Sequence, residues 1–255
     1  MTLSHDLTGT GPTVVLLHSS IADRRMWQPQ VPVLLGAGYQ VLSCDFRGYG
    51  ETPMAQSYSD AEDVRDLLDE LAVPAAIVVG SSFGGRVAQE IAVRWPDRVS
   101  GLVLLCPGMT AARPSPELMD FAEREDSLLA IGDIDGAADL NVATWLGPEA
   151  DDHIRADVRA MQRHAFAVQV AFGPEAGPSS TPVDVSMIDA PTLVVSGVHD
   201  LQDFRAIATF LASRIPGARH VELSWAGHLP SLERPGDVNE LLIDFLSENS
   251  RERHL

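Results

Sequence analysis

The chain has 255 residues, 45% hydrophobic and 21% charged, a composition typical of globular proteins that excludes a disordered chain, a collagen or a coiled coil. Its net charge of -18 has the wrong sign for binding nucleic acid or an anionic membrane surface. All 18 basic residues are arginine, which excludes chemistry that needs a lysine, such as a Schiff base. No stretch is long and apolar enough to cross a membrane and no leader pattern is found, so we expect a cytoplasmic protein.

Short apolar runs rich in Val and Leu recur along the chain and are bounded by Gly, Pro or charged residues. Such runs are typical of strands buried on both faces of a sheet, and they lie at 13–17, 40–44, 75–79, 102–106, 192–196 and 218–223. Stretches with helical period lie between them, one opened by Ser59 and Glu62 at capping-box spacing, and two more at 204–215 and 238–246. This alternation predicts a mostly parallel sheet covered by helices on both faces.

The alternation stops after the run at 102–106. From there to residue 191 we find no strand signal, only Pro and Gly punctuation, a loop, and helical stretches at 117–129, 137–146 and 154–172. The loop is expected at 174–182. We therefore expect a core formed by residues 1–107 and 191–255, and a helical insertion at 108–190 that acts as a cap over a pocket.

The strongest local signal is the segment Gly-Ser-Ser-Phe-Gly-Gly at 80–85, which follows a predicted strand and opens a helical stretch. It fits the pattern G-x-S-x-G, in which a tight strand-to-helix turn exposes the central serine at the carboxyl edge of the sheet. That serine is Ser82, whereas Ser81 lies one place too early. We therefore predict that Ser82 is a nucleophile rather than part of an ordinary Gly/Ser turn.

A nucleophilic serine needs a base to take its proton and a third group to orient that base. Asp200 and His228 each follow a predicted strand, so both side chains should reach the sheet edge that carries Ser82. We predict Asp200 as the acid and His228 as the base, with Asp203 and His199 as competing neighbours. Serine, acid and histidine in this chain order are typical of one hydrolase architecture.

The loop that leaves the first predicted strand can supply a second donor to a negatively charged oxygen on the substrate. Our candidate donors are the backbone N–H groups of Ser20 and Phe83. We interpret His18 and Trp27 as packing and loop-bracing residues. The segment Asp-Phe-Arg-Gly-Tyr-Gly at 45–50 is interpreted as a turn tied by its own Asp–Arg ion pair, not as a carboxylate site.

Four segments in this order resemble signatures of the α/β-hydrolase superfamily, and the resemblance covers nearly the whole chain: 45–50, 80–85, 197–200 and 227–228. Within the superfamily, residues 18–30 and 227–235 resemble those of small cap-bearing esterases and lactonases, a group that includes 3-oxoadipate enol-lactonases and cofactor-free haloperoxidases. The resemblance implies a mostly parallel sheet of about seven strands flanked by helices, with a helical cap inserted after the family's sixth strand.

The resemblance also implies the roles given above to the nucleophile, base and acid. It places Cys44 and Cys106 on strands that are not adjacent, so no disulfide is expected. The chain departs from the family in two places. Ser19 stands where the family commonly has Gly, and only about a dozen residues precede Thr13, so one edge strand is expected to be missing.

These residues predict a serine hydrolase that cleaves a small carboxylic ester or lactone through an acyl-enzyme, without cofactor or metal. Two alternatives stay open, namely carbon–carbon bond hydrolysis or perhydrolysis by the same triad, and a non-catalytic ligand receptor on a hydrolase fold. The expected partner is the small-molecule substrate, and a homo-oligomer stays open. Apolar pocket walls are predicted at Ile21, Met109, Trp145, Leu146, Phe166 and Leu229.

Overall fold

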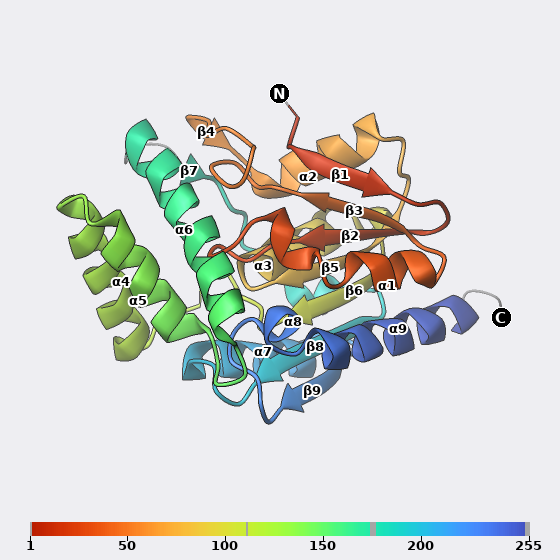
Figure 1. Cartoon of the computed structure of the whole chain (residues 1–255). Coiled ribbons are helices and arrows are strands. Elements are labelled where there is room, and N and C mark those ends of the chain that lie inside the picture. Colours follow the sequence, from red (N-terminus) through yellow and green to blue (C-terminus); the bar gives the residue numbers. More distant parts are fainter. Residues whose placement is uncertain (1, 111, 174–176, 253–255) are drawn as a thin grey trace.

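A computed structural model describes residues 2–110, 112–173 and 177–252 (Figure 1). The strands of its central sheet are β1 (His5–Thr8), β2 (Thr13–Leu17), β3 (Gln40–Cys44), β5 (Ala76–Ser81), β6 (Val99–Leu105), β8 (Thr192–Gly197) and β9 (Arg219–Leu223). They form a 7-stranded sheet in the order β1-β3-β2-β5-β6-β8-β9. β1 pairs antiparallel with β3, and the other neighbours pair in parallel. The predicted fold class and number of strands are confirmed.

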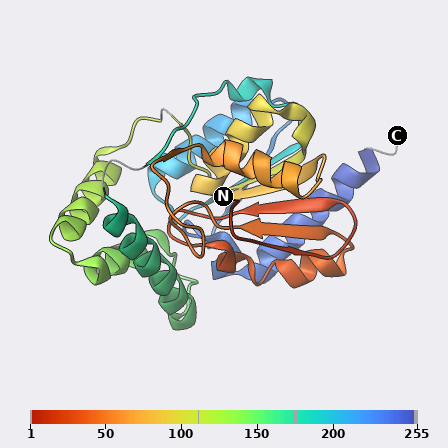
Figure 2. The ribbon, with the colours of Figure 1, turned by 90° about the horizontal axis from the view of Figure 1, so that it is seen from above.

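Helices cover both faces of the sheet, which explains why β2, β5 and β8 are mostly apolar and are buried along their whole length (Figure 2). The expectation of burial on both faces is wrong for the predicted strand at 218–223, because β9 is an edge strand with exposed polar residues. Successive residues of β2 point to opposite faces, with Val15 and Leu17 in one core cluster and Val14 and Leu16 in the other. The first cluster packs against α2 (Asp60–Glu70), α3 (Phe83–Arg94) and α7 (Gln202–Arg214). The second packs against α1 (Val31–Gly36) and α9 (Pro235–Glu252).

The insertion contributes three helices, α4 (Pro116–Ala130), α5 (Ile134–Trp145) and α6 (Asp152–Phe172), close to the predicted ranges. They lie together beyond the carboxyl ends of the parallel strands (Figure 1). The side chains of Ser115, Asp133 and Asp151 cap their N-termini by accepting from backbone N–H groups. α5 begins earlier than predicted because Asp133 accepts from the N–H of Gly136 and starts the helix ahead of the apolar positions.

Three short strands escaped the sequence analysis. β1 is an exposed polar edge strand, so it lacks the apolar pattern of the others. β4 (Ser57–Tyr58) and β7 (Gly177–Pro178) pair in parallel, and two residues carry no periodicity. The expectation that no strand lies between 107 and 191 is therefore wrong at 177–178; residues 174–176 of the predicted loop lie outside the described residues.

The remaining elements are short: the 3-10 helices η1 (Arg24–Trp27), η2 (Pro96–Arg98) and η3 (Val185–Met187), and the helix α8 (Pro230–Glu233). Cys44 at the end of β3 and Cys106 just after β6 are buried free thiols, and β2 and β5 lie between these two strands. Within the described ranges, no helix combines the length and the apolar character needed to cross a membrane.

The turn at 45–50 is not tied by its own ion pair, which corrects the prediction. The buried carboxylate of Asp45 pairs with Arg24 and also accepts from the backbone N–H groups of Arg24 and Glu51 at 2.8 and 2.9 Å. Arg47 instead pairs with Asp63 on α2 at 2.6 Å. Asp45 therefore fastens this turn to η1, and the carboxylate is used for structure.

Candidate active site

Ser82 lies where β5 ends and α3 begins, with a backbone φ of 50° and ψ of -110°. This conformation is strained for a residue with a side chain, and hydrogen bonds hold it from both sides. The Ser82 N–H donates to the Leu105 carbonyl at 2.9 Å, and the Ser82 carbonyl accepts from the Gly108 N–H at 2.9 Å. A Cβ on Gly80 or Gly84 would lie 2.5 or 2.3 Å from backbone atoms, so glycine is required on both sides of the turn.

The three side chains predicted as a triad form one row of hydrogen-bond contacts. His228 Nε2 lies 2.7 Å from Ser82 Oγ, and His228 Nδ1 lies 2.8 Å from Asp200 Oδ2. All three residues are buried, and the other oxygen of Asp200 accepts from the Leu201 N–H at 2.7 Å. With the proton on Nδ1 facing Asp200, Nε2 can accept the serine proton. The loops after β5, β8 and β9 carry these residues, as the sequence analysis expects.

Two aromatic rings enclose the His228 imidazole. The ring centroids of Trp145 and Phe204 lie 4.7 and 4.3 Å from that of His228. The backbone of His228 is also fixed, because its N–H donates to the Trp145 carbonyl at 3.0 Å. Since Trp145 is the last residue of α5, the insertion contacts both the ring and the backbone of this histidine.

The buried carboxylate of Glu233 holds the backbone around His228, and the sequence analysis did not identify it. Glu233 accepts from the N–H groups of Gly227 and Leu229 at 2.8 and 3.1 Å, and also from the backbone of Gly147. Burial raises the pKa of this carboxyl group, and the three N–H groups act in the opposite direction. The only sequence signal was an acidic residue inside the otherwise family-like segment 227–235.

The backbone of the turn after α5 contacts the backbone of the loop that carries His228, which we call the histidine loop. A Cβ on Gly147 would lie 2.5 Å from the backbone nitrogen of Gly227, and a Cβ on Gly227 would lie 2.4 Å from that of Gly147. Neither position has room for a side chain unless the backbone moves. The insertion and the core therefore meet here at a contact that requires glycine on both sides.

The two candidate oxyanion donors, the N–H groups of Ser20 and Phe83, make no hydrogen bond with any group in the described part of the chain. His18 braces the first loop, with Nε2 accepting from the Phe46 N–H at 2.9 Å and Nδ1 contacting the Ser19 carbonyl at 2.8 Å. Burial lowers the pKa of His18, which favours the neutral ring that these contacts need. Ser19, where the family commonly has Gly, does not adopt a positive φ.

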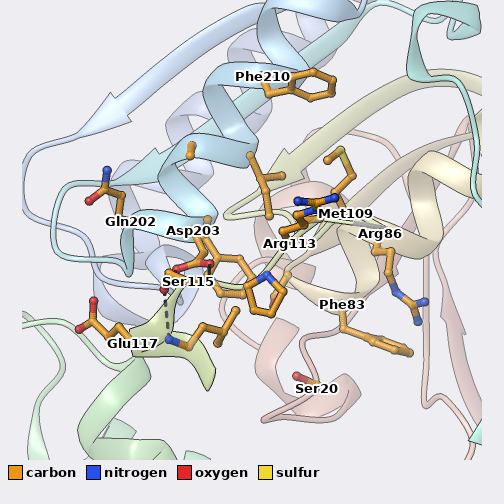
Figure 3. Close-up of a pocket in the computed structure, with 18 of the residues that line it drawn as sticks. Ser20, Phe83, Arg86, Met109, Arg113, Ser115, Glu117, Gln202, Asp203 and Phe210 are labelled. Carbon is orange, nitrogen blue, oxygen red and sulfur yellow. Dashed lines mark hydrogen bonds between the residues drawn. The ribbon is translucent and has the colours of Figure 1, made fainter. Parts of the chain in front are cut away.

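Ser82, Ser20 and Phe83 line a cavity of about 960 Å³ (Figure 3). Its other apolar walls come from α7, the start of α4 and the segment before it, through Met109, Leu118, Phe204, Ile207 and Phe210. Charged side chains also line it, namely Arg86, Arg113, Glu117 and Asp203.

The predicted pocket walls are distributed between different sites. Met109 lines the cavity next to Ser82, and Phe166 lines a second cavity beside it. The other four are buried in the core cluster on the α1 and α9 face or pack against it, and line neither of these two cavities: Ile21, Trp145, Leu146 and Leu229. The walls beside Ser82 come mainly from residues 108–109 and 112–118 and from α7, and the sequence analysis took α7 only as a core helix.

The competing residues serve other contacts. Asp203 accepts from the N–H and hydroxyl of Ser115 at 2.7 and 2.6 Å and so ties α7 to the start of α4. The Ser81 hydroxyl is buried without a hydrogen-bond partner in the described structure, and His199 is exposed. Trp27 is fully buried, in keeping with a packing role.

The sulfur of Cys106 lies close to the side chains of Asp200 and His228. One ligand atom each of Cys106, Asp200 and His228 lie within 4.8 Å of one another, a spacing that could suit a metal ion. Burial raises the pKa of the Cys106 thiol well above its usual range, so the thiol stays protonated. His228 and Asp200 already bond to each other, so this donor set fits a triad with a neutral thiol beside it better than a metal centre.

A model of the alpha/beta hydrolase family matches residues 14–241 of this sequence. The chain belongs to the alpha/beta hydrolase family. A relative from Mycobacterium tuberculosis, with the provisional name non-heme bromoperoxidase BpoC, is 29% identical over 261 residues, or 96% of this chain and 97% of the relative. A solved enol-lactonase from Burkholderia xenovorans LB400 is 30% identical with a TM-score of 0.79, over 96% of each chain.

Another similar solved member of the alpha/beta hydrolase family is Est816, described as an N-acyl homoserine lactone degrading enzyme. It is 29% identical with a TM-score of 0.78, over 95% of this chain and 96% of that chain. Relatives and structural neighbours are thus hydrolases, and the prediction of an enzyme of this class is confirmed.

Proposed function

We propose that this alpha/beta hydrolase is a serine hydrolase that cleaves a small carboxylic ester or lactone through an acyl-enzyme. The observation that supports this most directly is the row from Asp200 through His228 to Ser82, which ends at the wall of a cavity large enough for a small organic molecule. The lactone-cleaving proteins among its structural neighbours favour the same substrate class.

In the proposed reaction, Ser82 Oγ bonds to the carbonyl carbon while His228 Nε2 takes the hydroxyl proton. Asp200 stabilises the imidazolium that forms and keeps the ring oriented. His228 then gives the proton to the departing alcohol oxygen as the ester bond breaks. A water molecule, activated by the same nitrogen, attacks the acyl-enzyme and releases the acid.

The N–H groups of Phe83 and Ser20 are proposed to stabilise the negative carbonyl oxygen of each tetrahedral intermediate. Phe83 is the first residue of α3, so its N–H has no partner within the helix and lies at the positive end of the helix dipole. A donor of this kind is worth about 3 kcal/mol in the transition state.

We further propose that residues 108–190 form a cap and that Met109 and Phe166 contact the substrate. The position of α4, α5 and α6 beyond the carboxyl ends of the strands supports this assignment (Figure 1). Trp145 would act through its contact with His228 rather than as a wall of the cavity.

The test is the intact mass of the protein after reaction with a serine-reactive fluorophosphonate. We expect one adduct on the wild type and on Ser81→Ala, the adjacent matched control, and none on Ser82→Ala. The Ser82→Ala variant should also lose more than about a thousandfold in kcat/KM on esters. An adduct that persists on Ser82→Ala, or the absence of an adduct on folded wild type, would contradict the proposal, and the latter would favour the receptor alternative.

A substrate panel then separates the reactions that the same triad could perform. Esters and lactones are compared with β-diketones, for carbon–carbon bond cleavage, and with peracid formation from acetate and hydrogen peroxide. Peracid formation is included because one relative is named as a bromoperoxidase. We expect the highest kcat/KM on an ester or lactone, and a higher value on another class would replace the assignment.

A further inference from the structure

A second cavity, of about 480 Å³, lies beside the one that contains Ser82. One side is formed by core residues between β3 and α2, among them Tyr49 and Met54, and the other by the facing helices α4 and α6 through Leu129, Phe166 and Val170. It therefore lies between the core and the insertion. Ser82 is not among its lining residues, so the cavity cannot hold the bond that reacts.

Phe83 lines both cavities. Its backbone N–H follows the nucleophile directly, while its ring points away from Met109 and Arg113 (Figure 3). The Phe46 ring packs against the Phe83 ring edge-on at 5.1 Å, and the Arg86 guanidinium lies 4.5 Å from its centroid. The Phe83 ring is therefore a fixed part of the boundary that the two cavities share.

Three polar side chains that line the second cavity, those of Arg47, Tyr49 and Gln169, are engaged with the protein, and Asp126, which also lines it, is exposed to solvent. Arg47 pairs with Asp63 at 2.6 Å, and Gln169 donates to the Gly48 carbonyl at 3.3 Å and hydrogen-bonds Tyr49. The remaining walls named above are aromatic or aliphatic. A ligand group that enters gains burial of apolar surface and few new polar contacts, which favours an uncharged hydrocarbon chain over a charged or hydroxylated group.

We propose that the second cavity binds the hydrocarbon chain of an ester or lactone substrate, with the chain running past the Phe83 ring from the scissile bond in the first cavity. This inference rests on the proposed function and adds a substrate class to it, namely substrates with a medium-length apolar chain on one side of the ester group. The bond breaks in the first cavity, and the second determines preference for chain length.

The experiment fills the second cavity and measures chain-length preference. Leu129→Trp places a larger side chain on the α4 wall of the second cavity. The matched control is Met119→Trp on the same helix, because Met119 is 59% exposed and does not line the cavity. Val170→Trp, from the α6 wall, is a second filling variant in case the first does not fold. Each protein is assayed on p-nitrophenyl acylates from acetate to octanoate and on alkyl acetates from methyl to octyl.

In one of the two series, wild type and Met119→Trp should prefer the long chain. Both filling variants should lower the ratio of kcat/KM for the longest to the shortest substrate by about tenfold or more, since each methylene lost from an apolar site is costly. The shortest substrate should change by no more than about twofold. The series that responds identifies whether the acyl or the alcohol side occupies the cavity.

Unchanged ratios in the filling variants, with short esters still hydrolysed, would overturn the assignment of the second cavity and leave the proposed function intact. A wild type that hydrolyses no ester and forms no fluorophosphonate adduct would overturn both. The short substrates and the adduct therefore distinguish the two failures.

Discussion

Asp60 is a buried carboxylate outside the proposed triad, at the first position of α2. It is 4% exposed, and its Oδ2 has no hydrogen-bond partner among the described atoms, with Arg86 at 4.0 Å as its ion-pair neighbour. Burial is the main cause that raises its pKa to about 7 from an ordinary value of 3.8; Asp63 and Glu90 add to the effect, and Arg86 opposes it.

This raised pKa predicts a pH-dependent loss of stability that Asp60→Asn should remove. The folded protein keeps a proton that the unfolded chain releases near pH 4, so the free energy of unfolding falls as pH rises from about 4 to about 7. Asp60→Asn should match the wild type near pH 4 and be more stable near pH 8, as measured by urea unfolding. Asp66→Asn, an exposed position of α2, controls for the lost charge, and a gap that shrinks toward pH 8 would contradict the prediction.

The positions of site residues could be predicted from the sequence where a recognisable strand comes just before them. Ser82 and Asp200 follow apolar strands and His228 follows the edge strand β9, and parallel strands bring such ends to one edge. Glu233 and Phe204 lack this signal. Their roles depend on which loop or ring they face in the folded chain, and a helical pattern shows only that a residue lies on a buried side.

At the scale of elements, α8 is a helix of one turn that ends at Glu233, whose carboxylate contacts the loop that carries His228. We predict that Glu233→Gln lowers kcat/KM about tenfold and the free energy of unfolding by about 1 to 3 kcal/mol. A glutamine presents one acceptor and one donor, so at least one of the N–H groups of Gly227 and Leu229 loses its acceptor.

Ester hydrolysis and urea unfolding of Glu233→Gln test this prediction. The control is Glu149→Gln, because Glu149 pairs with Arg234 at the surface, where an ion pair contributes little. Equal effects of the two substitutions would contradict a special role for the buried carboxylate.

The helices of the insertion were predictable because their caps and apolar stripes are local properties of the chain. The pairing of β4 with β7 was not, because it joins residues 57–58 to residues 177–178 by contacts with no sequence period. The ion pair of Asp45 with Arg24, rather than with Arg47, could not be predicted either. It depends on the tertiary packing that places η1 beside the turn.

At the scale of the whole molecule, the net charge of -18 predicts a stability that increases with salt. Most ion pairs are partly or largely exposed and worth little, whereas the unbalanced carboxylates repel each other throughout the folded chain. The Tm should rise when sodium chloride increases from about 0.01 M to about 0.15 M, as the screening length shortens. Choline chloride should give the same rise, and a fall in Tm would contradict the argument.

Strand and helix alternation predicted the sheet and its two layers because each apolar run must be buried on both faces. It could not predict the cavities, since their shape depends on how the insertion packs against α7 and against the loop after β3. The fold could thus be predicted from the pattern of apolar residues in the sequence. The walls of the cavities could be identified only from the packing of the folded chain.

The glycine contact between the turn after α5 and the loop that carries His228 limits how the insertion can be exchanged between relatives. A chimaera that takes a foreign insertion must present a residue without a side chain opposite Gly227, or the loop that carries the proposed base will shift. Grafts that keep Gly147 should retain ester hydrolysis, while grafts with a bulkier residue there should fold and lose it. Positions 147 and 227 therefore have to be exchanged together in such chimaeras, although they lie 80 positions apart in the sequence.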